Sequence, residues 1–138
     1  MDTFTPSQIN IVLQVVILAI LCAGLALKKK NKFFFHGTIM LIAVLLNVFS
    51  FLLVMLPSLL SLEVIVTQPA SRFSLVILVH ASLGAVVIAL AIWLTATWHL
   101  SSDTRKCFRR KLIMRVTSIL WMITLLLGIV LYWYLYGF

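Results

Sequence analysis

The sequence contains few charged residues, and acidic residues are the scarcest of them. Of 138 residues, 10% are charged and only three are Asp or Glu, whereas 64% are hydrophobic. A soluble domain carries roughly 25% charged residues, so this chain has too few to cover its surface against water. The scarcity of charge argues against an ordinary soluble domain. It predicts an integral membrane protein in which residues 1–138 form a single domain.

Long apolar runs predict membrane-spanning helices. They cover about residues 9–27, 33–56, 73–99 and 112–136, and each has the roughly 20 residues needed to cross about 30 Å of hydrocarbon. The residues before the first run include no Lys or Arg, unlike a signal peptide, so we expect this run to be kept as a span. The predicted fold class is all-α, an integral membrane four-helix bundle. The shorter apolar piece Leu59–Val66 is expected to lie along the membrane surface.

Motifs of soluble enzymes and metal proteins are absent from the sequence. Cys22 and Cys107 make neither a disulfide framework nor a CxxC motif, and no HExxH or Walker-type pattern occurs. None of the long apolar runs contains a carboxylate, and no internal repeat is present, which argues against a proton-coupled transporter or a channel. We therefore predict that the chain is not an enzyme.

Basic residues are concentrated in two stretches. Residues 28–32 and 105–115 hold all of the 11 Lys and Arg except Arg72, and two predicted spans separate the stretches. Because basic loops favour the cytoplasmic side, we predict that both loops are cytoplasmic and both termini lie outside, in a cell membrane. An aromatic belt at the outer interface would consist of Tyr132, Trp133, Tyr134 and Tyr136. The net charge of +8 suits anionic lipid, so no nucleic-acid partner is expected.

Helical spacing assigns an interior face to each run, because small and polar residues pack membrane helices together. The predicted interior residues are Asn10, Gln14, Leu21 and Gly24; His36, Met40, Ala43, Asn47 and Ser50; Ala81, Ala85 and Ala89, with His80, Gly84, Val87 and Ala91 beside them; and Thr117, Trp121, Thr124 and Gly128. We expect a neighbouring helix to come close to Ala85. Packing alone is a sufficient role for most of these polar residues.

Three histidines are the main candidates for chemistry, because a histidine inside a membrane span is costly. His36 opens the second run and His99 closes the third at the same depth, which suits two axial haem ligands or part of a metal site. His80 lies about 28 Å further out along its helix, near the depth of Met55, and these two residues would suit an outer haem. The alternatives are an interfacial role for His36 and His99, and a quinol contact or proton relay for His80.

Several short motifs occur in a characteristic order. They are Gly24 with Lys28-Lys29-Lys30, His36-Gly37-Thr38-Ile39-Met40, Leu75 with Val79-His80, and Arg109-Arg110-Lys111 with Arg115, Trp121, Gly128 and Tyr132. The chain resembles the small four-span membrane family described as domain of unknown function 420, in which positions matching His36, Met40 and His80 recur. Some bacterial members are linked to the maturation of haem–copper oxidases, and the layout is similar to that of di-haem b-type cytochromes. The family's histidine before the last span is missing here, and the resemblance then leaves His99 as the expected substitute.

Two functional hypotheses follow from the residues and from the resemblance. The first is a small accessory or assembly subunit of a respiratory or other redox membrane complex, with other integral membrane subunits as partners. The alternative is an electron-transfer protein that binds haem b through His36 and His99, with His80 and Met55 as further ligands. Quinol is a further expected partner. An interaction protein without any cofactor is the competing class.

Overall fold

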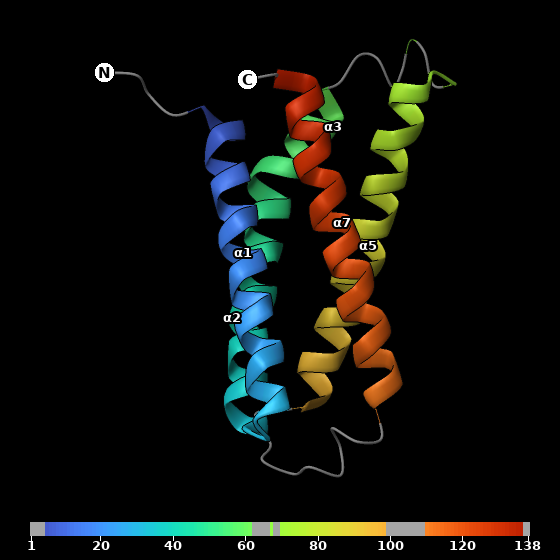
Figure 1. The fold of residues 1–138 in the computed structure, drawn as a ribbon. Helices are drawn as coiled ribbons and strands as arrows, with labels where there is room; N and C mark the ends of the chain where they lie inside the picture. Colours follow the sequence, from blue (N-terminus) through green and yellow to red (C-terminus); the bar gives the residue numbers. More distant parts are fainter. Residues whose placement is uncertain (1–4, 62–66, 68–69, 99–109, 137–138) are drawn as a thin grey trace.

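The structure is a computed structural model that describes residues 5–61, 67, 70–98 and 110–136. Every regular element within these residues is helical. The elements are α1 (Pro6–Lys29), α2 (Phe33–Ser50), the π-helical turn η1 (Phe51–Met55), α3 (Leu56–Ser61), α5 (Arg72–Trp98) and α7 (Lys111–Tyr136) (Figure 1). Four helical stretches are long and apolar enough to cross a membrane. The predicted four-helix membrane fold is therefore confirmed.

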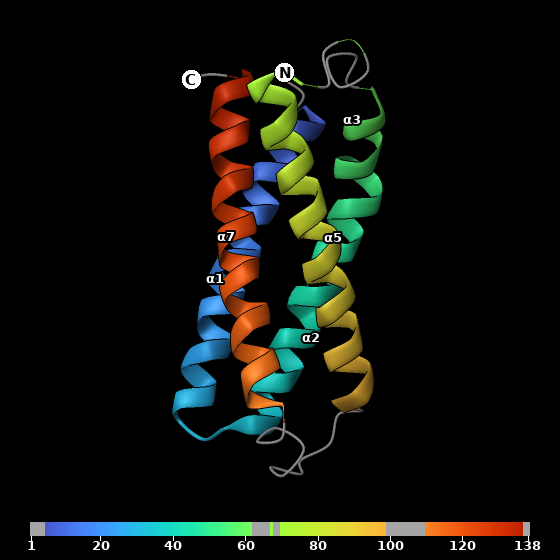
Figure 2. The same cartoon turned by 90° about the vertical axis from the view of Figure 1, so that its right-hand side faces the viewer.

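The four spans run side by side as an up-and-down bundle (Figures 1 and 2). α1 packs along α2 and α5 along α7, while contacts of α2 with α5 and of α1 with α7 close the bundle. The start of α1 and the end of α7 lie at one end, which we call the terminal end. The opposite end, which we call the basic end, carries Lys28 and Lys29 in the last turn of α1 and Lys111 at the start of α7. Which end faces the cytoplasm stays a prediction.

The first helix begins with a capping box. Thr5 precedes Pro6, which takes the first helical position, where its missing N–H costs nothing. The Gln8 backbone N–H donates to Thr5 Oγ1 over 3.4 Å, and the Thr5 backbone N–H donates to Gln8 Oε1 over 2.9 Å. These bonds satisfy backbone donors that a helix start otherwise leaves unpaired. The basic residues in the last turn suit the negative end of the helix dipole.

The second span differs from the prediction, because the helix continues through Pro57 to Ser61. A proline inside a helix removes one hydrogen bond and clashes with the carbonyl four residues before it, here Leu53. The chain widens into the π-helical turn η1 just before this point, and the Leu56 N–H donates to the Phe51 carbonyl. The described part of Leu59–Val66 thus extends the span, which contradicts the predicted surface segment there. Residues 62–66 lie outside the described residues.

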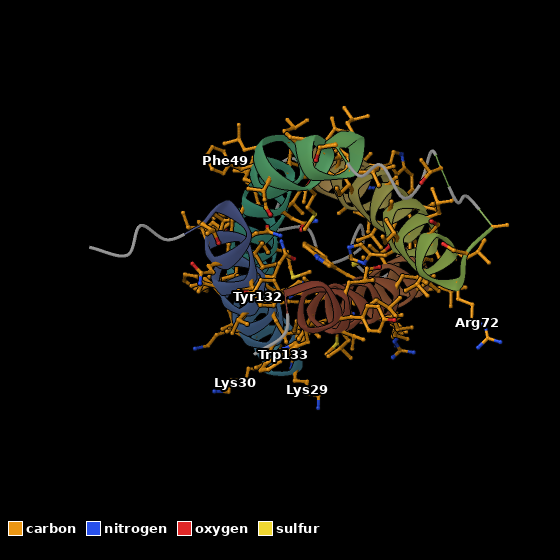
Figure 3. The ribbon with its side chains drawn as sticks, turned by 90° about the horizontal axis from the view of Figure 1, so that it is seen from above. Lys29, Lys30, Phe49, Arg72, Tyr132 and Trp133 are labelled. Atoms are coloured by element: carbon orange, nitrogen blue, oxygen red, sulfur yellow. The ribbon has the colours of Figure 1, made fainter. Side chains whose placement is uncertain are left out.

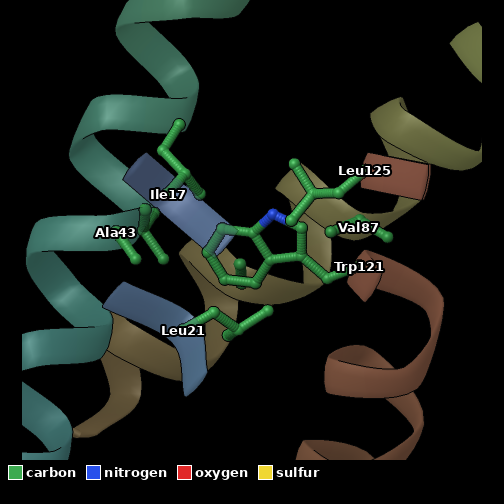
Figure 4. Packing of buried hydrophobic residues seen from close by; sticks show 8 residues of the cluster. Ile17, Leu21, Ala43, Val87, Trp121 and Leu125 are labelled. Carbon is green, nitrogen blue, oxygen red and sulfur yellow. The ribbon is translucent and has the colours of Figure 1, made fainter. Parts of the chain in front are cut away.

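Trp121 lies at the centre of the apolar core and joins all four spans. It is 1% exposed and packs in a cluster with Ile17 and Leu21 from α1, Ala43 from α2 and Val87 from α5 (Figure 4). A large aromatic ring in this position fills the space between two helix hairpins. The cluster therefore fixes how the four helices pack at the middle of the bundle. Other side chains occupy the interior at the terminal end.

The predicted interior faces of α1, α2 and α7 are confirmed, whereas one stripe on α5 was predicted wrongly. Ala85 and Ala89 are exposed, and Val87 and Ala91 are buried instead, with His80 half-buried. Neighbouring residues on a helix lie about 100° apart, so a rotation of the helix by about 100° exchanges the two stripes. Turning His80 inward moves a polar ring away from lipid. The free energy gained in this way exceeds the free energy gained by burying alanines.

Candidate functional site

A partly open cavity of about 170 Å³ lies between the four spans. Its wall is mostly apolar, and the polar side chains in it are Asn10, Gln14, Asn47, His80, Trp121, Thr124 and Tyr132. Along α7 the cavity extends from the middle of the helix to Tyr132, near the terminal end. Figure 3 looks down on this end, with the helices arranged around the centre of the bundle. The site therefore lies in the half of the bundle that contains the start of α1 and the end of α7.

A hydrogen-bonded group of three polar residues joins α1 to α2 beside the cavity. Gln14 Nε2 donates to Ser50 Oγ over 2.9 Å, and Ser50 Oγ donates to Asn10 Oδ1 over 2.5 Å. Gln14 Nε2 also lies 3.5 Å from Asn10 Oδ1 within α1. Polar groups bonded in this way hold membrane helices together. Much of the hydrogen-bonding capacity of this wall is therefore used inside the protein.

Among the fully buried polar atoms on residues of the site, two have no partner in the described part of the chain. They are Nδ1 of His80 and Nε1 of Trp121, and both are buried. The Thr124 hydroxyl nearby is already used, since it donates to the Leu120 carbonyl over 2.7 Å. Buried polar atoms in native proteins are nearly always hydrogen-bonded, so two unpaired atoms on residues of one cavity wall require an explanation.

Gly128 determines how closely the His80 ring approaches α7. A Cβ atom added at Gly128 would lie 3.1 Å from His80 Cε1, closer than side chains normally pack. The backbone carbonyl of Thr124, one turn earlier on α7, also lies beside the ring. The absence of a side chain at Gly128 thus lets His80 lie against α7, with the ring held between two helices. The inward stripe of α7 therefore makes room for the His80 ring at Gly128.

His36 lies outside the cavity, between α1 and α2 near the basic end. It is 8% exposed, and its Nδ1 lies 2.6 Å from the backbone carbonyl oxygen of Gly24. The predicted partner His99 lies outside the described residues, so the pairing of His36 with His99 stays a prediction. By contrast, the structure brings His80 and Met55 to the wall of one cavity, as their depths indicated.

The cavity does not fit haem. A volume of about 150 Å³ accommodates one benzene molecule, and the cavity of about 170 Å³ is only slightly larger. A porphyrin contains four pyrrole rings and needs several times that space. Within the described residues, no three His, Cys, Asp or Glu side chains are grouped to hold a metal ion. The site is therefore suited to a single-ring molecule rather than to a macrocycle.

Sequence reasoning found the interior position of Trp121 but missed its unpaired indole N–H. The stripe pattern places a residue on a face, whereas hydrogen-bond partners depend on the rotation of each helix about its axis.

No family model, curated protein or solved structure matches the chain.

Proposed function

We propose that the protein is a small accessory or assembly subunit of a redox complex in a cell membrane. In this proposal it binds a transmembrane helix of a partner subunit through the outer face of α5. We define the α5 outer face as Ser82, Ala85, Ala89 and Ala96, which are all exposed and follow one another at helical spacing. This face is the observation that carries the proposal.

Small residues on a lipid-facing helix allow another helix to come close. Ala85 and Ala89 are four residues apart, which is the small-xxx-small spacing found where membrane helices pack. A smaller share of α5 is buried inside the bundle than of each of the other three spans. α5 is therefore the span with the most surface left for an external partner. The apolar residues beside this face select a transmembrane helix as the occupant.

The redox part of the proposal rests on the resemblance described above. The His36-to-Met40 motif and His80 match positions that recur in a family with members linked to oxidase maturation. In this proposal the protein itself catalyses no reaction, and its contribution is to hold or assemble neighbouring subunits. The haem-carrier alternative receives no support from the cavity volume, so we derive no electron-transfer step from it.

The test is purification of the tagged full-length chain from its own membranes in a mild detergent. We expect it to migrate on a native gel with subunits of a redox complex that keeps its characteristic haem spectrum. A protein that migrates alone, or only as a homodimer, contradicts the accessory role.

A matched pair of variants tests the face itself. Ala85→Leu fills the small surface, so we expect at least about five-fold less co-purified complex, because overpacking a close helix interface typically costs about 1–3 kcal/mol. Ala23→Leu makes the same change at an exposed position of α1 and should leave the yield unchanged. Equal yields from both variants would show that the partner binds elsewhere.

A further inference from the structure

The geometry points to the cavity as a binding site for a single aromatic ring that carries hydroxyl groups, of the hydroquinone class. This inference concerns the isolated protein and does not depend on the accessory role. It rests on the volume of the cavity and on two residues of its wall, His80 and Trp121, each of which has a buried polar atom without a partner in the described part of the chain.

The size of the cavity favours one ring. Its volume of about 170 Å³ is close to the volume of about 150 Å³ that accommodates benzene in a protein interior. Apolar side chains form most of the wall, including Ile77, Val87 and Leu125. Such a wall suits the faces and edges of an aromatic ring. It offers a cluster of water molecules few hydrogen-bond partners. Ligand sites commonly combine an apolar wall with a few placed polar groups.

The chemistry of the two unpaired atoms selects a hydroxyl group. The indole Nε1 of Trp121 is only ever a donor, so it needs an acceptor oxygen. A neutral His80 with its proton on Nε2 presents Nδ1 as an acceptor, so it needs an O–H donor. A hydroquinone supplies both, because each of its hydroxyl groups donates one hydrogen bond and accepts others. A hydrocarbon of equal size supplies neither.

The charge of the site favours a neutral ligand. Among the described residues, no Lys, Arg, Asp or Glu side chain lines the cavity. An ionised ligand would therefore have no opposite charge to offset the loss of its hydration. A neutral hydroquinone dissolves in the membrane and can reach a partly open cavity between spans. The same reasoning disfavours nucleotides and carboxylates as ligands of this site.

The binding experiment uses the purified full-length protein in nanodiscs of phosphatidylcholine. Dimethylhydroquinone is the probe, and tetramethylbenzene, in which methyl groups of similar size replace both hydroxyl groups, is the matched control compound. A ligand that binds only the folded state raises the thermal midpoint as its concentration increases. We expect the hydroquinone to raise the midpoint and tetramethylbenzene to bind at least about five-fold more weakly, as loss of two hydrogen bonds predicts. Equal shifts with both compounds, or no shift with either, would overturn the inference.

Variants then place the binding in the cavity. Gly84→Leu adds a side chain to the cavity wall, and the nearest atom to a Cβ there is Thr124 Cγ2 at an ordinary 3.7 Å, so the first carbon fits. We expect this variant to lose the ligand-induced shift, whereas Ala23→Leu, exposed on α1, should keep it.

Trp121→Phe provides a second measurement that is independent of cavity filling. It keeps an aromatic ring in the core and removes the Nε1 donor, so we expect about ten-fold weaker hydroquinone binding. Trp133→Phe changes an exposed tryptophan of the same helix and should bind as the wild type does. Unchanged binding in both Gly84→Leu and Trp121→Phe would show that the ring does not bind in this cavity.

Discussion

The Nδ1 atom of His36 lies 2.6 Å from the carbonyl oxygen of Gly24. A carbonyl only accepts, so the ring carries its proton on Nδ1 and donates it across the gap between α2 and α1. The same two helices are in close contact one turn further along, where a Cβ on Gly24 would lie 2.9 Å from Met40 Sδ. His36 thus links the two helices of the first hairpin near the basic end, whatever further role its other ring nitrogen has.

Replacing His36 should loosen this hairpin. We expect His36→Phe to lower the free energy of unfolding by about 0.6 kcal/mol, the average measured for side-chain hydrogen bonds between membrane helices, and by no more than about 1.7 kcal/mol. Unfolding by increasing dodecyl sulfate in mixed micelles measures the effect. Thr38→Val is the control, because the Thr38 hydroxyl donates to the Phe34 carbonyl of its own helix. Identical transitions for the two variants would contradict the proposed link.

Gly24 should tolerate no large side chain. Gly24→Leu forces the Met40 and Ile39 side chains to move, because the added Cβ alone would lie within 3.4 Å of both. Overpacking of this kind costs typically about 1–3 kcal/mol, and the same unfolding measurement reports it. Ala23→Leu, one residue away and exposed, should unfold like the wild type. If both variants were equally stable, the close contact of α1 with α2 would be wrong.

Ser50 should contribute more to the stability of the bundle than the small size of its side chain indicates. It accepts a hydrogen bond from Gln14 and donates one to Asn10, so Ser50→Ala breaks both links between α2 and α1. We expect a loss of about 0.6–1.7 kcal/mol in the free energy of unfolding. Ser82→Ala, at an exposed position of α5, should change it little. A destabilisation by Ser82→Ala as large as that by Ser50→Ala would rule out a special role for the group.

The number and type of helices could be predicted from the sequence because the apolar runs are long and separated by charges or prolines. The inward stripes of α1, α2 and α7 could also be predicted, since in each helix most of the polar residues gather on one face. On α5 the alanines and His80 indicated two adjacent faces as the inward one, and helical spacing alone does not show which of the two is buried. The cost of exposing His80 to lipid decides between them.

The remaining features depend on geometry that a residue pattern does not contain. The helix continues past Pro57 because a π-helical turn precedes it, and the sequence Phe51–Met55 carries no signal for that turn. The unpaired atoms of His80 and Trp121 depend on how two helices are rotated against each other. The depth of Met55 could be predicted by counting residues, and the structure does place it with His80.

The orientation of the bundle in the membrane can be tested with Cys107. This residue lies in the basic stretch 105–115, outside the described residues, and we expect that stretch to face the cytoplasm. An impermeant maleimide should label Cys107 in inside-out vesicles and leave it unlabelled in intact cells. Cys107→Ser, which retains only the thiol of Cys22 in a span, should abolish the labelling. Labelling in intact cells would reverse the predicted orientation.

Haem binding, which the electron-transfer hypothesis requires, is the subject of the last prediction. His80 and Met55 share a cavity of about 170 Å³, too small for a porphyrin. The Nδ1 of His36 is bonded to Gly24 in a closely packed hairpin. We therefore expect protein expressed with ample haem to purify without a Soret band, both oxidised and reduced. A low-spin haem spectrum would contradict this expectation. Its loss in His36→Ala but not in His80→Ala would then assign the iron to the basic end, because loss of one axial imidazole leaves the iron five-coordinate.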